Sequence, residues 1–288
     1  MLASFRAGTT IAATLLGAGV LGVTAADAAS IEIQNAIARV TVIPEARSDV
    51  AVTIVRDDPH KPLKVRVWPD GRVVVDGGVF GGLFGGVTEC NSHGGKPYVR
   101  VFGGETVTYD NMAQVVVHTP LDAHVSGSGA VFGEVGRSDS LDLSTSGCGD
   151  WVVANVRGRL SLSSSGSGDI RTGTASEIRV RTAGSGDIYT RAISGGIDAN
   201  IAGSSDIKID QVSGPMKVRI SGSGNLGVGG GHASDLDVFI AGSGDVSFRG
   251  VADNLTAFVA GSGDINVDHV TGVVKKSIAG SGDVNIGR

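Results

Sequence analysis

The sequence is poor in the residues that mark several common classes of protein. Only 5% of its 288 residues are aromatic, and it has two cysteines and seven prolines. Basic residues are not in excess, because the formal net charge is -5, which argues against a broad electrostatic grip on nucleic acid. Beyond the N-terminal segment no apolar run is long enough to cross a bilayer, so we expect no membrane span in the mature protein.

Glycine, in contrast, is abundant. The chain has 46 glycines without a Gly-X-Y triplet, which excludes collagen. Hydrophobic residues make up 41% of the chain and are regularly placed, which argues against a flexible low-complexity linker. The composition therefore predicts a folded, glycine-rich protein.

The first 28 residues have the order of a secretory signal peptide. Arg6 precedes an apolar run over Ile11–Val23, and Ala26-Asp27-Ala28 follows it as an A-x-A cleavage site. The apolar run is too short to span a bilayer comfortably. We predict cleavage after Ala28 and an exported protein, located in the periplasm or at the cell surface.

A short Gly-Ser-Gly-Asp phrase recurs nine times in the second half of the chain. It reads AGSGDI at 183–188 and 260–265, and its weaker copies include SGSGAV at 126–131 and SGCGDW at 146–151. The steps between the first glycines lie between 18 and 20 residues, which indicates one structural unit stacked on itself. Those first glycines are Gly127, Gly147, Gly166, Gly184, Gly203, Gly222, Gly242, Gly261 and Gly280.

Within each copy apolar residues alternate with polar ones, which is the pattern of a β-strand. Stacked parallel strands would bury the apolar side of every copy and pair its backbone. We therefore predict an all-β fold, a single-stranded right-handed parallel β-helix with about nine regular 19-residue rungs over 121–288. Strict alternation would turn both motif glycines inward and the Ser and Asp columns outward.

Residues 29–120 are strand-like but less periodic, and we expect irregular early rungs and a cap, continuous with 121–288 as one domain. Inside this part, 77–97 contains eight glycines and is predicted to be the long loop of the protein. Phe80, Leu83 and Phe84 lie in that loop. They form either a partner-binding patch or a cover over the end of the β-helix.

The phrase A-G-S-G-D-[IV] at this spacing resembles the bacterial head GIN domain family of auto-transporter adhesins. NAIARVTVIP (35–44) and VVVHTPLDAHVSGSG (115–129) extend the resemblance over most of the mature chain. It implies a secreted β-helix without an established biochemical role, and it carries over no catalytic residues.

The most conspicuous candidate site is a column of carboxylates with an interruption at Asn225 and with Ala130 in place of its first member. Stacked charges about 4.8 Å apart repel by roughly 0.9 kcal/mol in water, which would favour a cation such as calcium. Each rung offers only one carboxylate, however, so we favour hydrogen bonds to nearby Ser hydroxyls or backbone N–H groups and expect no cofactor. The members are Asp150, Asp169, Asp187, Asp206, Asp245, Asp264 and Asp283.

Three smaller features complete the candidate set. Cys90 and Cys148 are predicted to form a disulfide that ties the loop to the second rung, the alternative being two free thiols. The serine column lacks a common histidine and is predicted to be a hydrogen-bonded ladder, not a set of nucleophiles. Phe239 and Phe258 fall at the same outward position on adjacent rungs. They form either a small binding platform or a simple exposed aromatic pair.

We predict a non-catalytic, adhesin-like binding or scaffolding module of the cell envelope. Its partner would be an envelope component, either a glycan or a protein. The module could also self-associate through the edge of its last rung, which we expect to be uncovered. The alternatives are a polysaccharide lyase or hydrolase and a calcium-binding repeat protein. The nearly constant step leaves no room in 121–288 for the long insertions that wall an active site.

Overall fold

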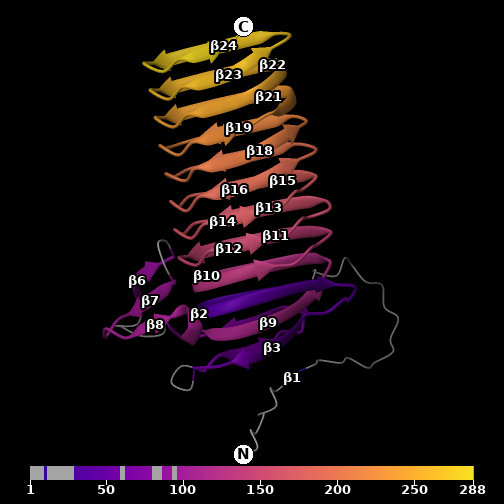
Figure 1. The fold of residues 1–288 in the computed structure, drawn as a ribbon, viewed down its shortest axis with the longest axis vertical. Coiled ribbons are helices and arrows are strands. Elements are labelled where there is room, and N and C mark those ends of the chain that lie inside the picture. The colour runs from indigo at the N-terminus through magenta and orange to yellow at the C-terminus, as the bar shows by residue number, and fades with distance from the viewer. Residues whose placement is uncertain (1–9, 12–28, 59–61, 80–85, 93–95, 288) are drawn as a thin grey trace, which may run out of the picture.

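The structure, a computed structural model, describes residues 10–11, 29–58, 62–79, 86–92 and 96–287. These residues are mostly β-strands stacked into a tall column, with the N-terminus at its base and the C-terminus at its top (Figure 1). The strands of successive rungs pair in parallel, which confirms the predicted parallel β-helix. Within the described ranges the helical content is one turn of 3-10 helix, η1 (Tyr109–Asn111).

Two sheets run up the column and meet at the corner that the Gly-Ser-Gly-Asp phrase forms. Face A contains β11 (Ser140–Gly147), β13 (Arg159–Ser164), β15 (Glu177–Thr182), β17 (Ile197–Ile201), β19 (Met216–Ile220), β21 (Gly231–Gly242) and β24 (Val274–Gly280). Face B contains β12 (Trp151–Val153), β14 (Ile170–Thr172), β16 (Ile188–Ile193), β18 (Ile207–Ser213), β20 (Leu226–Val228), β23 (Ile265–Val270) and β25 (Val284–Ile286). Two longer strands, β10 (Asp122–Val135) and β22 (Val246–Gly261), belong to both faces.

The core is built from columns of inward side chains, because alternate residues of every strand face the interior. Ile170, Ile188 and Ile207 occupy one such column and are fully buried. Trp151 continues this column and is equally buried. Its large ring fits because two glycines of the neighbouring rung leave space: a methyl group at Gly133 would lie 2.2 Å from the ring and one at Gly127 2.7 Å.

The first copy of the phrase is offset from the others. Gly129, and not Gly127, pairs with Gly147, so the step there is 18 residues and the alignment expected from the sequence is wrong by two. A shift of two preserves which side chains face inward, so the core pattern survives. The physical reason is Trp151, whose ring needs Gly127 and Gly133 beside it.

The corner glycines have a different role from the one expected. The second glycine is buried, as Gly168 is, whereas the first lies at the corner and is partly exposed. What excludes a side chain is the neighbouring rung and not the opposite wall: a methyl group at Gly168 would lie 2.1 Å from the carbonyl oxygen of Gly149. Ser205 replaces the second glycine in one copy, and its buried hydroxyl pairs with Thr182 Oγ1 at 2.8 Å.

The base of the column is assembled out of sequence order. Strand β2 (Ser30–Glu45) forms one full rung against β10. The rung below it combines β5 (Val73–Asp76) on face A with β9 (Ala113–Pro120) on face B. The antiparallel strands β4 (Lys64–Val67) and β3 (Ala51–Arg56) close this rung, and β1 (Thr10–Ile11) pairs with β3.

The chain between β5 and β9 leaves the column at the corner and forms a separate sheet. Its strands are β6 (Val87–Asn91), β7 (Tyr98–Val101) and β8 (Thr106–Thr108), all antiparallel, and we call them the side sheet. Part of the predicted loop 77–97 is therefore strand β6. The glycine content of this stretch gave no sign of the strand, because Val87–Asn91 pairs with β7, which lies outside the glycine-rich stretch.

Candidate functional site

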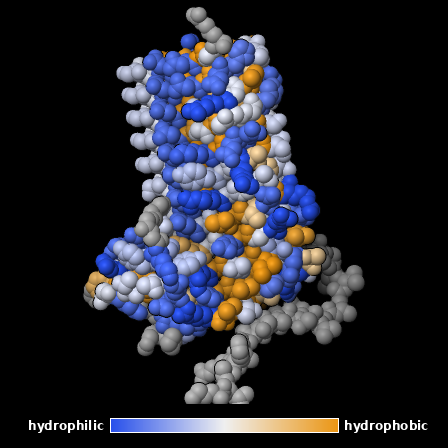
Figure 2. All heavy atoms as spheres, in the orientation of Figure 1, coloured by the Kyte–Doolittle hydropathy of each residue, from blue (hydrophilic) through white to orange (hydrophobic). Residues whose placement is uncertain are grey.

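An open groove of about 520 Å³ lies on the lower part of face B, with Pro97 and Tyr109, which flank the strands β7 and β8 of the side sheet, at one edge. Figure 2 shows hydrophobic surface gathered on these lower rungs, beside the more polar side sheet, whereas the upper column is mostly polar. We call this feature the corner groove. It is lined by Arg39, Val40, Thr41, Val55, Pro97, Tyr109, Gln114, Val115, Val116, Phe132, Gly133, Glu134, Asp150, Val152 and Arg171.

The register of face B sets the floor of the groove. One outward column runs through Val116, Thr41, Glu134, Val152 and Arg171, each hydrogen-bonded in register with the next. The two valines leave apolar surface between the polar members, and Val152 is 50% exposed. The floor thus combines two apolar side chains with one polar and two charged ones, stacked at the spacing of the rungs.

A second outward column, Gln114, Arg39 and Phe132, lies nearer the side sheet. The wall above it is made by η1. The ring of Tyr109 meets Phe132 edge-on with centroids 5.7 Å apart, and the Arg39 guanidinium lies 4.6 Å over the Tyr109 ring. The Arg39 guanidinium therefore packs against the wall, and this cation–π contact fixes its orientation.

Hydrogen bonds and one ion pair brace this wall. Arg56 donates to the Asp110 carbonyl and, at 3.1 Å, to Asn111 Oδ1. Lys96 Nζ lies 2.6 Å from Asp110 Oδ2, and this hydrogen bond, more than any other contact, lowers the pKa of the Asp110 carboxyl. The side chain is exposed, so the pair orients the wall more than it stabilises the fold.

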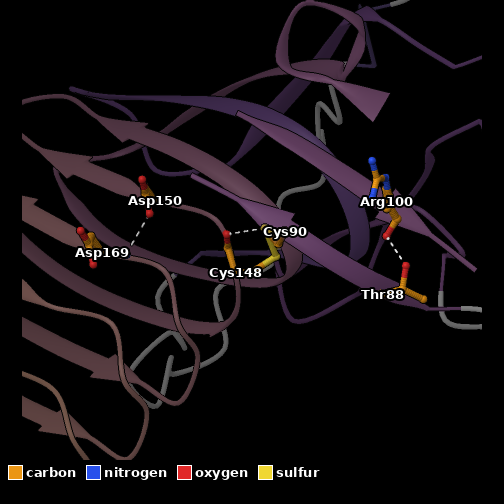
Figure 3. Close-up of a disulfide and its surroundings, with 6 residues drawn as sticks. All are labelled: Thr88, Cys90, Arg100, Cys148, Asp150 and Asp169. Atoms are coloured by element: carbon orange, nitrogen blue, oxygen red, sulfur yellow. Dashed lines mark hydrogen bonds between the residues drawn. A yellow bond between two sulfur atoms is a disulfide. The ribbon is translucent and has the colours of Figure 1, made fainter. Parts of the chain in front are cut away.

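The disulfide predicted from the sequence is present: Cys90 of β6 is bonded to Cys148 at the corner of the rung above β10, with 6.1 Å between the Cα atoms (Figure 3). Around it a second hydrophobic cluster joins the side sheet to the column. Ala130 and Phe132 contribute from β10, and Val99 and Val101 from β7. The side sheet is thus fixed to the column by a covalent bond and by packing, and η1, which follows β8 directly, is held with it beside the groove.

The carboxylate column forms a hydrogen-bonded ladder between rungs. In each step the backbone N–H of one member donates to Oδ1 of the member below, as from Asp187 to Asp169 at 2.9 Å and from Asp206 to Asp187 at 3.0 Å. Asn225 takes the same place, accepting from Asp245 N at 2.8 Å. We call this set the aspartate ladder; its members are Asp150, Asp169, Asp187, Asp206, Asn225, Asp245, Asp264 and Asp283.

Among the described residues no group of three or more His, Cys, Asp or Glu side chains is arranged to hold a metal ion. The ladder gives one carboxylate oxygen of each step to a backbone donor, and calcium would have to use the others. Calcium binding thus remains a hypothesis for solution experiments.

The two other surface columns differ from their expected roles. In the serine column the backbone N–H groups donate to glycine carbonyls of the neighbouring rung, as Ser185 does to Gly166 at 3.0 Å. The predicted ladder of hydroxyls is not seen within the described ranges. Phe239 and Phe258 stack nearly parallel, 4.9 Å apart, so each ring covers a face of the other and the pair presents mainly ring edges.

The structure thus joins few of the sequence candidates. Of the predicted carboxylates only Asp150 lines the corner groove, and Cys90 and Cys148 fix the side sheet, which η1 follows. Phe80, Leu83 and Phe84 lie outside the described residues. Sequence reasoning missed Arg39, Tyr109 and Glu134. The available signal was the altered first copy of the repeat: with its shifted register Phe132, and not Ala130 as expected, takes the place of a first carboxylate, so an apolar residue stands in that outward column.

A family model described as "Putative auto-transporter adhesin, head GIN domain" matches residues 100–231 and 194–287. Among solved structures, a "putative cell adhesion protein" from Clostridium sporogenes is 9% identical, with a TM-score of 0.20, over 90% of this chain and 92% of that one. No curated protein matches. Within the described residues, the structure has no helix with the length and apolar character of a membrane span.

Proposed function

The chain belongs to the head GIN domain family, and from this premise we propose that it is an exported, non-catalytic, adhesin-like module that binds an envelope component in the corner groove. The observation that carries the proposal is the groove itself. It is the place where the repeat is interrupted, where a separate sheet is added and bonded, and where apolar and charged side chains converge.

Export is supported by two independent features of the chain. The order of Arg6, the apolar run and Ala26-Asp27-Ala28 is that of a cleaved signal peptide. The disulfide between Cys90 and Cys148 is the kind of bond that persists outside the cytosol. Cleavage after Ala28 would remove β1 and leave the outer edge of β3 without that partner.

A binding role fits the chemistry of the groove better than catalysis. Asp150 already accepts a hydrogen bond from the Asp169 backbone at 2.9 Å, so one of its oxygens serves the ladder. The alternative, a polysaccharide lyase or hydrolase, rests on Glu134 and Asp150 as two carboxylates of one groove. Release of new chain ends from a polysaccharide, abolished by Glu134→Gln, would favour the enzyme over the binding module.

The test of the binding role is a comparison of two matched variants. Val152→Glu places a charge on the apolar floor, whereas Val251→Glu makes the same change at an exposed valine that does not line the groove. We expect residues 29–288 to bind immobilised envelope fractions, and Val152→Glu but not Val251→Glu to weaken that binding. Both variants should retain the melting temperature of the parent. Equal binding by the two would locate the contact elsewhere.

A further inference from the structure

We infer that the ligand of the corner groove is a neutral saccharide, an inference that rests on the proposed binding role of that groove. The first argument is the order of charges along its floor. Arg39, Glu134, Asp150 and Arg171 come from four consecutive rungs, β2, β10, β12 and β14, and so span about 14 Å. Positive side chains lie at both ends and negative ones between them.

This order disfavours a charged ligand of either sign. An anionic chain would meet Glu134 and Asp150 in the middle of the floor, and a cationic chain would meet the guanidinium groups at both ends. Arg171 is in addition balanced by Asp169, whose Oδ2 lies 3.4 Å from its Nη2. A ligand without net charge avoids both kinds of repulsion and can still use every polar group as a donor or an acceptor.

The second argument is the hydrogen-bonding capacity that the groove leaves unused. Within the part of the chain that the structure describes, the side chains of Arg39, Gln114 and Glu134 line the groove and make no hydrogen bond with the protein. These groups supply donors, an amide and an acceptor within neighbouring rungs. Hydroxyl groups can match all three, since each both donates and accepts.

The third argument is the apolar surface between the polar groups. Val116 and Val152 lie on the floor on either side of Thr41 and Glu134, and the rings of Tyr109 and Phe132 lie along the wall. The C–H face of a sugar ring would cover the valines while its hydroxyls reach the polar side chains. An extended peptide would not gain strand pairing here, because the floor is the face of a sheet whose backbone bonds are already used.

The experiment measures binding of three series of linear hexasaccharides to residues 29–288 by calorimetry: neutral hexoses, galacturonates and glucosamines. The groove variants are Glu134→Gln and Arg39→Gln. The matched control is Glu177→Gln on face A, where the same chemical change affects only an exposed ion pair with Arg159. Far-UV spectra and melting temperatures show that each variant is folded.

We expect the neutral series to bind, and both groove variants to weaken its binding about tenfold or more, with the control unchanged. Binding of only the galacturonates or the glucosamines would overturn the inference. So would neutral binding that the groove variants leave intact. If no saccharide binds while Val152→Glu still reduces capture on envelope fractions, the ligand class is wrong but the proposed function stands. If no saccharide binds and Val152→Glu leaves that capture unchanged, both the ligand class and the binding role of the groove are wrong.

Discussion

Replacing Asp187 by Asn and by Ala tests the aspartate ladder. Asp187 lies near the middle of the column, partly buried, and its Oδ1 accepts the backbone N–H of Asp206 at 3.0 Å. Asn keeps a carbonyl oxygen at that position, whereas Ala removes it. Asn225 already performs the same task in the native protein, accepting from Asp245 N at 2.8 Å, so the Asn variant copies an arrangement that this fold accommodates.

Both substitutions also remove one charge from a stacked series. With neighbours about 4.8 Å away on each side, the relief of repulsion is at most about 2 kcal/mol in water and is reduced by salt. Because the relief is common to both variants, the difference between them isolates the hydrogen bond. Leaving the Asp206 N–H without an acceptor should make the Ala variant about 1–2 kcal/mol less stable than the Asn variant.

The assay is thermal and urea unfolding of residues 29–288, with the Asn variant expected to melt close to the parent. A difference of about 1–2 kcal/mol corresponds to roughly 2–4 °C in a chain of this size. Equal stability of the Asn and Ala variants would refute the ladder as the reason for the aspartates. Repeating the melts with calcium and with chelator tests the metal hypothesis: a calcium-dependent rise that Asp187→Asn abolishes would show that the carboxylates bind the ion.

Three further outcomes follow from the same structure. Cys148→Ser removes the disulfide, which closes a loop of 58 residues and stabilises the fold by up to about 4 kcal/mol in the chain-entropy description. The side sheet should then be the first region cut in limited proteolysis, and an unchanged cutting pattern would contradict the role of the disulfide as its anchor. Gly168→Ala should destabilise the fold by about 1–3 kcal/mol and lower its melting temperature, because the added methyl would lie 2.1 Å from a carbonyl oxygen of the neighbouring rung. Gly227→Ala, with open space around it, should be neutral, and similar melting temperatures for the two variants would show that close contact between rungs is not what requires glycine at 168. Lys276 faces inward beside Ala257 in a column that is otherwise aliphatic, and among the described residues its strand β24 is paired with β22 alone. Lys276→Val should increase self-association in sedimentation velocity, and identical profiles would show that the lysine does not protect this edge.

The sequence predicted the architecture because the repeat is a local and periodic signal. Alternation within AGSGDI identifies strands, and a step of 18 to 20 residues without insertions allows one stacked arrangement for them. It also predicted the bond between Cys90 and Cys148, since export makes a disulfide the favoured state of two cysteines.

The register of the first copy could not be read in the same way. The spacing of glycines gave Gly127 as the partner of Gly147, but the volume of the Trp151 ring moves the pairing to Gly129. Similarly, an aspartate in an outward column is compatible with a metal site or with a hydrogen bond. Only the position of the next rung's N–H group, set by the stacking, shows that the ladder uses it.

By itself, then, the sequence determined the β-helix, its rung length and the covalent link at its corner, because each depends on residues that repeat or on the chemistry of a single pair. The tertiary structure decided where the groove lies. Arg39, Tyr109 and Glu134 are far apart in the chain, and they meet because β2 is inserted between β9 and β10 and the intervening residues fold out as the side sheet. A site made by such a long-range exchange of strand order leaves no periodic signal in the sequence.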